Sequence, residues 1–277
     1  MSAASRILAT SGQEIRIARR NRWALLSTLL LTLFALSLAL FAAGQAGQVK
    51  ADTLTLTAAS LATLSVYLIP LIALLVSYDA FAGEVERGTL ALTLATPLGR
   101  GEMFAGKFLG QAAVVGLAIL IAFASAATVV AATGGLTAAG AIAWLRLGLT
   151  SLVLGGVFVG LGLAISAATP RTGTAAAFAV GLWLVFVVLY DIALLGAVIA
   201  AGESTFTTHV FPWLVLANPA DSFRLYNLVS LDTAPVAGID GLARTLPIPP
   251  AATLVPLFLW VTAALAAGIA LVRRLTP

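Results

Sequence analysis

Six apolar stretches, each long enough to cross a lipid bilayer, constrain this chain more than any other feature. A bilayer's hydrocarbon core is about 30 Å thick, and a helix that rises about 1.5 Å per residue needs about 20 apolar residues to cross it. Because no water is present there to bond the backbone polar groups, each crossing must be a helix. The sequence therefore predicts an all-α membrane protein with six transmembrane helices. The expected spans are residues 24–43, 59–80, 110–132, 145–168, 174–201 and 251–272.

Charged residues are few and unevenly placed along this chain. Only 9% of the residues are charged, against 61% that are hydrophobic. With both termini in the cytoplasm, most of the 15 Lys and Arg residues fall on the inner side, as the positive-inside rule requires. The sequence therefore predicts a multi-pass protein of a bacterial inner (plasma) membrane, with both termini cytoplasmic. The net charge of +4 follows from this topology, and no nucleic-acid partner is expected.

The region ahead of the first span is basic. Residues 2–22 mix apolar side chains with five arginines, so they predict a short helix in the inner headgroup layer with its basic side against anionic membrane lipid. The alternative is a frayed cytoplasmic leader. The length of 277 residues fits a single transmembrane domain, residues 1–277, without a separate soluble domain of usual size.

Residues 81–109 join the second and third spans on the cytoplasmic side. Glu84 and Glu86 lead this segment, which suits a helix N-terminus, and Pro97 would end the helix. We expect one short amphipathic helix over residues 83–97, exposed to the cytoplasm, where a soluble partner could push against it. The alternative is a solvated linker.

Residues 101–108 come within one residue of a nucleotide-binding P-loop. That motif needs Ser or Thr after its lysine to hold Mg²⁺, and it needs a preceding strand in a soluble α/β domain. Here Phe108 follows Lys107, and a predicted span follows both. We therefore expect this chain to bind neither ATP nor any other cofactor.

The inner connection also carries a family resemblance. Its acidic-x-x-Arg-Gly-Thr-Leu sequence at 84–90, followed by a proline, an arginine and a Gly-Lys pair, resembles the loop between spans two and three of ABC-2 type exporter permeases. The resemblance implies that two six-span subunits pair, and that each offers a coupling helix to a separate ATPase subunit, which binds ATP and Mg²⁺. It implies no enzyme activity in this chain. The residues that it assigns to coupling are Glu84, Glu86, Arg87, Gly88, Thr89, Leu90, Pro97 and Arg100.

Residues 202–250 form the long outer connection between the fifth and sixth spans. Within it, residues 209–229 are apolar enough to dip into the membrane but too short and broken to cross it. Asn218 and Pro219 suit the N-cap and first position of a short helix, with Asp221 in its first turn. Re-entrant backbone is tolerated only against protein or a watery cavity. We therefore expect a periplasmic re-entrant hairpin that covers the centre of a homodimer and acts as an outer gate.

A narrower resemblance rests on three places in the sequence. They are Asn218-Pro219-x-Asp221-x-x-Arg224-Leu225-x-Asn227-Leu228, Leu71-Ile72-Ala73-Leu74-Leu75 leading into Tyr78-Asp79-Ala80, and Pro97-Leu98-Gly99-Arg100-Gly101. Together they resemble the permeases of ABC systems that mature the copper sites of nitrous oxide reductase. That resemblance implies a periplasmic β-helical copper-maturation protein seated on the permease. The residues implied for the gate or for docking are Asn218, Pro219, Asp221, Arg224 and Asn227, with Asp232 and Asp240 in the same loop.

The sequence has few side chains that could carry a copper ion across the membrane. A route for the free ion would need soft or imidazole ligands, but the chain has no cysteine, one histidine (His209) and two methionines (Met1 and Met103). We expect no metal site, and we interpret His209 as an interfacial side chain. Two accounts fit. Either the cargo is a copper- or sulfur-related species other than the bare ion, or the permease only transmits ATPase motion to a partner outside, which is our working hypothesis.

Asp191 is the one carboxylate well inside a predicted span. An ionisable group is costly there, so a functional role is the default hypothesis. The alternative is an aspartate that faces the bundle and bonds a neighbouring hydroxyl or Trp183.

Two other functions stay open at this point. One keeps the ABC-2 architecture but exports a drug, peptide or lipid. The other is a proton-coupled secondary transporter that uses Asp191. Many secondary transporters contain inverted repeats, and none is visible in this sequence.

Overall fold

The computed structural model describes residues 2–44, 53–132, 137–202, 204–229 and 249–275, which are mostly helical and contain no strand. This part of the chain has six helical segments long and apolar enough to cross a membrane. The predicted all-α membrane fold with six spans is therefore confirmed. The six segments are Arg22–Gly44, Thr53–Glu86, Arg100–Ala132, Ala138–Ala168, Thr172–Ala201 and Ala251–Val272.

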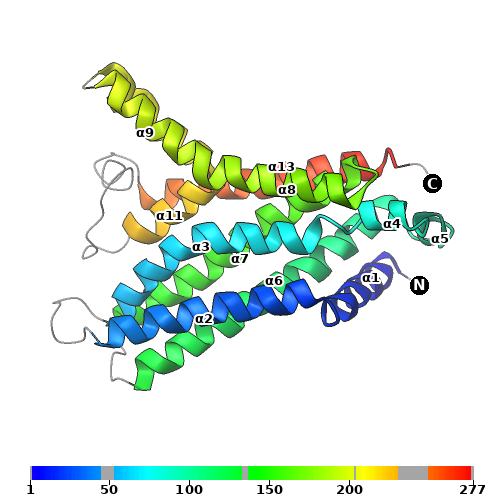
Figure 1. Cartoon of the computed structure of the whole chain (residues 1–277), viewed down its shortest axis with the longest axis horizontal. Coiled ribbons are helices and arrows are strands. Elements are labelled where there is room, and N and C mark those ends of the chain that lie inside the picture. Colours follow the sequence, from blue (N-terminus) through cyan, green and yellow to red (C-terminus); the bar gives the residue numbers. More distant parts are fainter. Residues whose placement is uncertain (1, 45–52, 133–136, 203, 230–248, 276–277) are drawn as a thin grey trace.

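Four long helices run side by side as a bundle: α2 (Arg22–Gly44), α3 (Thr53–Ser77), α6 (Arg100–Ala132) and α7 (Ala138–Ala168) (Figure 1). Helix α3 is central, because it packs against each of the other three and also against α8 (Thr172–Leu184). The last helix, α13 (Leu254–Val272), follows a short 3₁₀ turn (Pro250–Thr253) and packs on α7.

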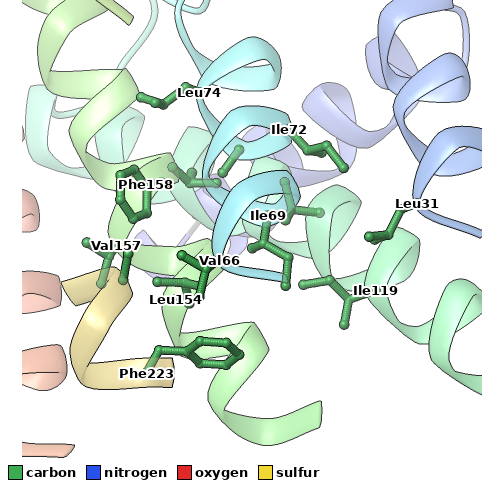
Figure 2. Close-up of a cluster of buried hydrophobic side chains, with 14 of the residues drawn as sticks. Leu31, Val66, Ile69, Ile72, Leu74, Ile119, Leu154, Val157, Phe158 and Phe223 are labelled. Carbon is green, nitrogen blue, oxygen red and sulfur yellow. The ribbon is translucent and has the colours of Figure 1, made fainter. Parts of the chain in front are cut away.

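The core lies between these helices. Figure 2 shows Val66 and Ile69 of α3 beside Leu154, Val157 and Phe158 of α7. Each of these five side chains is at most 1% exposed. Each of the other spans contacts α3 or α7, and α2 also packs closely against α6, while apolar side chains outside these contacts stay on the surface, as expected for a protein solvated by lipid.

The fifth span is interrupted. Between α8 and α9 (Tyr190–Ala201), residues Val185–Leu189 form one turn of π-helix. Such turns bend helices, and in Figure 1 α9 leans away from the bundle. The extra residue in this turn also changes which carbonyl oxygens are available to side chains outside the helix.

Three short helices gather at the end of the bundle where α13 finishes: α1 (Ala3–Ala18), α4 (Ala82–Glu86) and α5 (Leu90–Leu94) (Figure 1). The predicted N-terminal helix is confirmed, and the alternative of a frayed leader is wrong. The Oγ atom of Ser2 caps α1 by accepting from the Ser5 amide at 3.2 Å.

The prediction of one helix over residues 83–97 is wrong. The segment contains two helices, because Gly88 between them has a φ of +69°. This left-handed conformation is accessible to glycine and ends a right-handed helix. Pro97 lies three residues beyond α5, so it follows a helix that has already ended at Leu94.

At the opposite end, a turn of π-helix (Phe206–Val210), α10 (Phe211–Ala217) and α11 (Pro219–Val229) follow the fifth span. The predicted start of a helix at Asn218-Pro219 is confirmed: the Ala220 amide donates to Asn218 Oδ1 at 2.9 Å. Helix α11 packs against α3, α7 and α13. Asp232 and Asp240 lie outside the described residues.

Candidate functional site

A buried lysine joins three helices at the end of the bundle that contains α1. The Lys107 side chain, near the start of α6, is 5% exposed, and its Nζ lies 2.7 Å from Glu14 Oε1 of α1 and 2.7 Å from Glu84 Oε1 of α4. Gln111 Nε2 donates to the second Glu14 oxygen at 3.1 Å. Two carboxylates thus share one ammonium group, and removing one partner of such a buried pair leaves an uncompensated charge at a cost of about 3–5 kcal/mol.

Two glycines bring α1 close enough for this contact. A Cβ atom at Gly106 would lie 2.5 Å from Thr10 Cβ, and one at Gly110 would lie 2.6 Å from Glu14 Cβ. Glycines four residues apart lie on the same face of a helix and let two backbones approach. The segment that approximates a P-loop is therefore part of α6, and its Gly106, together with Gly110 just after it, forms the surface on which α1 packs.

A second ion pair fixes the other end of α1. Arg6 donates from Nη2 to Glu102 Oε1 at 2.6 Å and from Nε to Oε2 at 2.9 Å. The hydrogen bond with Glu102 raises the pKa of Arg6, so the guanidinium stays charged. Glu102 also accepts from the Gly99 amide at 3.0 Å, which ties the start of α6 to this pair. Helix α1 is thus attached to α6 at two points, one partly buried and one buried.

The segment assigned to coupling is tied to other spans as well. Glu86 accepts from the Thr172 amide at 2.9 Å and from its hydroxyl at 2.5 Å, at the first residue of α8. At the start of α4, Ser166 Oγ of α7 accepts from the amides of Phe81 and Ala82 at 2.9 and 3.0 Å. A displacement of α4 would therefore strain its hydrogen bonds to α7 and α8 as well as its ion pair with α6.

The remaining coupling residues divide by exposure. Leu90 is buried, whereas Arg87, Gly88 and Pro97 are exposed. Leu92 of α5 lies outside the set expected to act in coupling, yet it is 72% exposed and is an apolar side chain that a partner could cover. Arg100 Nη1 donates to the Arg273 carbonyl oxygen at 2.5 Å, which links the start of α6 to the end of α13.

A second charged cluster lies at the far end of the bundle. Arg224 of α11 donates from Nη2 to Asp221 Oδ1 at 2.6 Å and to Asp191 Oδ2 of α9 at 3.2 Å. The alternative in which Asp191 bonds a hydroxyl or Trp183 is wrong, because Asp191 accepts from Arg224 and Trp183 Nε1 donates to the Tyr67 carbonyl oxygen. A guanidinium is the stronger partner for a carboxylate, and α11 brings one within reach.

The α10–α11 hairpin is held by its own polar side chains. Asn218 Nδ2 donates to the Phe186 carbonyl oxygen, in the π-turn of the fifth span, at 2.6 Å, and Asn227 Nδ2 donates to Thr150 Oγ1 of α7 at 3.0 Å. All five residues expected at the gate or docking surface have buried side chains, and they are Asn218, Pro219, Asp221, Arg224 and Asn227. Burial within the single chain tests neither the gate role nor the docking role, and both stay predictions.

No group of three or more His, Asp or Glu residues within the described ranges is placed to hold a metal ion. His209 is exposed in the π-turn ahead of α10. The two charged clusters, around Lys107 and around Arg224, form ion pairs that hold neighbouring helices together at both ends of the bundle.

Residues 8–274 of the chain match the family described as "ABC-2 family transporter protein". The chain belongs to the ABC-2 family. It is 43% identical over 264 residues to the "Probable ABC transporter permease protein NosY" of Pseudomonas aeruginosa, covering 95% of this chain and 96% of the relative. It is 38% identical over 265 residues to the protein of the same name from Stutzerimonas stutzeri, with the same coverage.

As a permease of the NosY type, the chain is the membrane component of an ABC transporter and not its ATPase. An ABC permease implies an ATPase partner. The alternative of a proton-coupled secondary transporter is therefore wrong.

Proposed function

We propose that this permease serves the ABC system that matures the copper sites of nitrous oxide reductase in a bacterial inner membrane, with both termini in the cytoplasm. The observation that carries this proposal is the 43% identity to a NosY permease over 95% of the chain. The Asn218–Leu228 sequence, which resembles permeases of such systems, supports it.

The proposed input of energy is at α4 and α5. ATP-driven closure of two ATPase subunits would displace α4, and the ion pairs of Glu84 with Lys107 and of Lys107 with Glu14 would carry this displacement to α6 and α1. A cavity of about 440 Å³ between α1, α5 and α6 leaves room beside Leu92 for such a movement. Coupling would then depend on ion pairs that stay favourable only while their short N–O distances are kept.

The proposed output is at the α10–α11 hairpin in a homodimer. Only 11% of the apolar stretch of the fifth span is buried within the single chain. This helix therefore has a face available to a second copy or to lipid. Movement of the fifth span would act on the hairpin through Asp191–Arg224 and through the bond from Asn218 to Phe186. The hairpin is proposed to be re-entrant and to act as the outer gate beneath a periplasmic partner.

For the cargo, we propose that the permease transmits ATPase motion rather than conducting bare copper. The chain has no cysteine and one histidine, which supports this account. Reconstituted complex that moves copper or a sulfur species into vesicles in an ATP-dependent manner would refute it and favour transport.

The function is tested by deleting the gene in a bacterium that depends on it and measuring the copper content of nitrous oxide reductase. We expect an enzyme deficient in copper, restored by the wild-type gene. If nitrous oxide reductase from the deletion strain contained its full copper content, the proposed role in copper-site maturation would be wrong. Export of a drug, peptide or lipid would then be the remaining function.

A further inference from the structure

A groove lies on the side of the bundle where α1 meets α2 and α6. Its volume is about 590 Å³, within the range of about 300–1,000 Å³ that is typical of ligand sites. Its walls are formed mainly by apolar side chains, among them Ile15, Ala18, Leu25, Ala113 and Leu117. The groove is thus shaped for an apolar ligand, and it lies at the end of the spans that receives the N-terminal helix.

Arginine side chains adjoin this groove. Arg19 lines it and also lines a second hollow of about 230 Å³, together with Arg16 and Arg20. None of these three guanidinium groups forms an ion pair or a side-chain hydrogen bond within the part of the chain that the structure describes. Arg19 therefore belongs both to the apolar groove and to the cluster of three arginines.

We infer that the two hollows form a single binding site for an anionic phospholipid, with an acyl chain in the groove and the phosphate against the arginines. Guanidinium groups bind phosphate with two parallel hydrogen bonds. Anionic lipids give the cytoplasmic leaflet a negative surface potential that attracts basic groups. A neutral lipid would fill the groove but leave the arginines without a counter-charge, so charge complementarity selects the anionic class.

The position of the site gives the lipid a structural effect. The groove is bounded by α1 on one side and by α2 and α6 on the other, and Arg19 lies in the turn that joins α1 to α2. A bound lipid would hold α1 against α6, where Glu14 reaches Lys107. The lipid thereby supports the placement of α1, independently of which cargo the transporter serves.

The test measures lipid binding to the purified complex of the permease with its ATPase subunit by native mass spectrometry. The probes are phosphatidylglycerol and phosphatidylcholine with identical acyl chains. We expect tighter binding of phosphatidylglycerol, weakened about fivefold by each of Arg16→Gln, Arg19→Gln and Arg20→Gln. The matched control is Arg274→Gln, an exposed arginine after α13 that lines neither hollow.

The groove is tested separately by filling it. Ala113→Phe should weaken the binding of both lipids, whereas Ala124→Phe, also exposed on α6 but outside the groove, should not. Equal binding of the two lipids, an Arg19→Gln variant that binds like Arg274→Gln, or matching behaviour of the two phenylalanine variants would overturn the inference. So would a disulfide between two copies of an Ala113→Cys variant in membranes, because a second copy would then occupy the groove.

Discussion

Lys107 Nζ and Glu84 Oε1 lie 2.7 Å apart, in an ion pair that joins the start of α6 to the helix α4 that leads the coupling segment. The same ammonium group bonds Glu14 of α1, so three helices meet at one buried cation. This contact gives the proposed coupling a physical basis, because α4 cannot move far without taking α6 and α1 with it or breaking a buried pair.

Replacing Lys107 should damage both stability and coupling. Lys107→Met leaves the buried Glu14 carboxylate and the partly buried Glu84 carboxylate without a cation, so we expect the unfolding free energy to fall by about 3–5 kcal/mol. Thermal unfolding of the complex measures this loss. The triple variant Glu14→Gln, Lys107→Met, Glu84→Gln removes all three charges and should recover much of the stability. In that variant, ATP hydrolysis should continue while enzyme maturation falls, and full maturation would contradict the role of the pair in coupling.

The contact between α1 and α6 can be tested with matched glycine substitutions in α6. Gly106→Ala places a Cβ 2.5 Å from Thr10 Cβ, whereas a Cβ at Gly101 meets nothing within 4 Å. We expect Gly106→Ala to lower stability by about 1–3 kcal/mol, as overpacking does, and Gly101→Ala to be neutral or slightly stabilising. Equal thermal stability of the two variants would mean that α1 does not pack on α6 in this way.

The break between α4 and α5 depends on the conformation of Gly88. A β-branched residue is strongly disfavoured at a φ of +69°, while asparagine tolerates the left-handed region better. We therefore expect Gly88→Val to shift α5 and reduce enzyme maturation more than Gly88→Asn does. The ratio of maturation to ATP hydrolysis measures coupling. Indistinguishable ratios in the two variants would show that this conformation is not needed.

The two carboxylates that bond Arg224 should differ in their roles. The Asp221 side chain is 2% exposed and that of Asp191 is 23% exposed. Asp191→Asn leaves Arg224 paired with Asp221, so assembly should stay intact while maturation of the enzyme falls. Asp221→Asn should lower thermal stability more. Normal maturation with Asp191→Asn would remove Asp191 from the mechanism.

Properties that depend on local sequence were predictable in this chain. The six spans follow from apolar length, and the start of α11 follows from the Asn218-Pro219 pair, because each is fixed by residues close together in the chain. The split of residues 83–97 into two helices also has a local cause, the left-handed conformation of Gly88, which the acidic start and Pro97 alone do not indicate.

Properties that depend on contacts between distant residues were not predictable. Glu14 and Lys107 are 93 residues apart, and Asp191 and Arg224 are 33 apart. Neither pairing follows from periodicity or composition. One signal is present in the sequence: the Gly106-x-x-x-Gly110 spacing around Lys107 indicates a face of α6 that another helix could approach closely.

The central claim is that an ATPase subunit acts on α4 and α5 from the cytoplasm. The chain contains no cysteine, so Leu92→Cys provides a single reactive thiol on the exposed side of α5. A membrane-impermeant thiol reagent should label it in inside-out vesicles only, and the ATPase subunit should protect it. Labelling from the periplasmic side, or labelling unaffected by the ATPase subunit, would contradict the account.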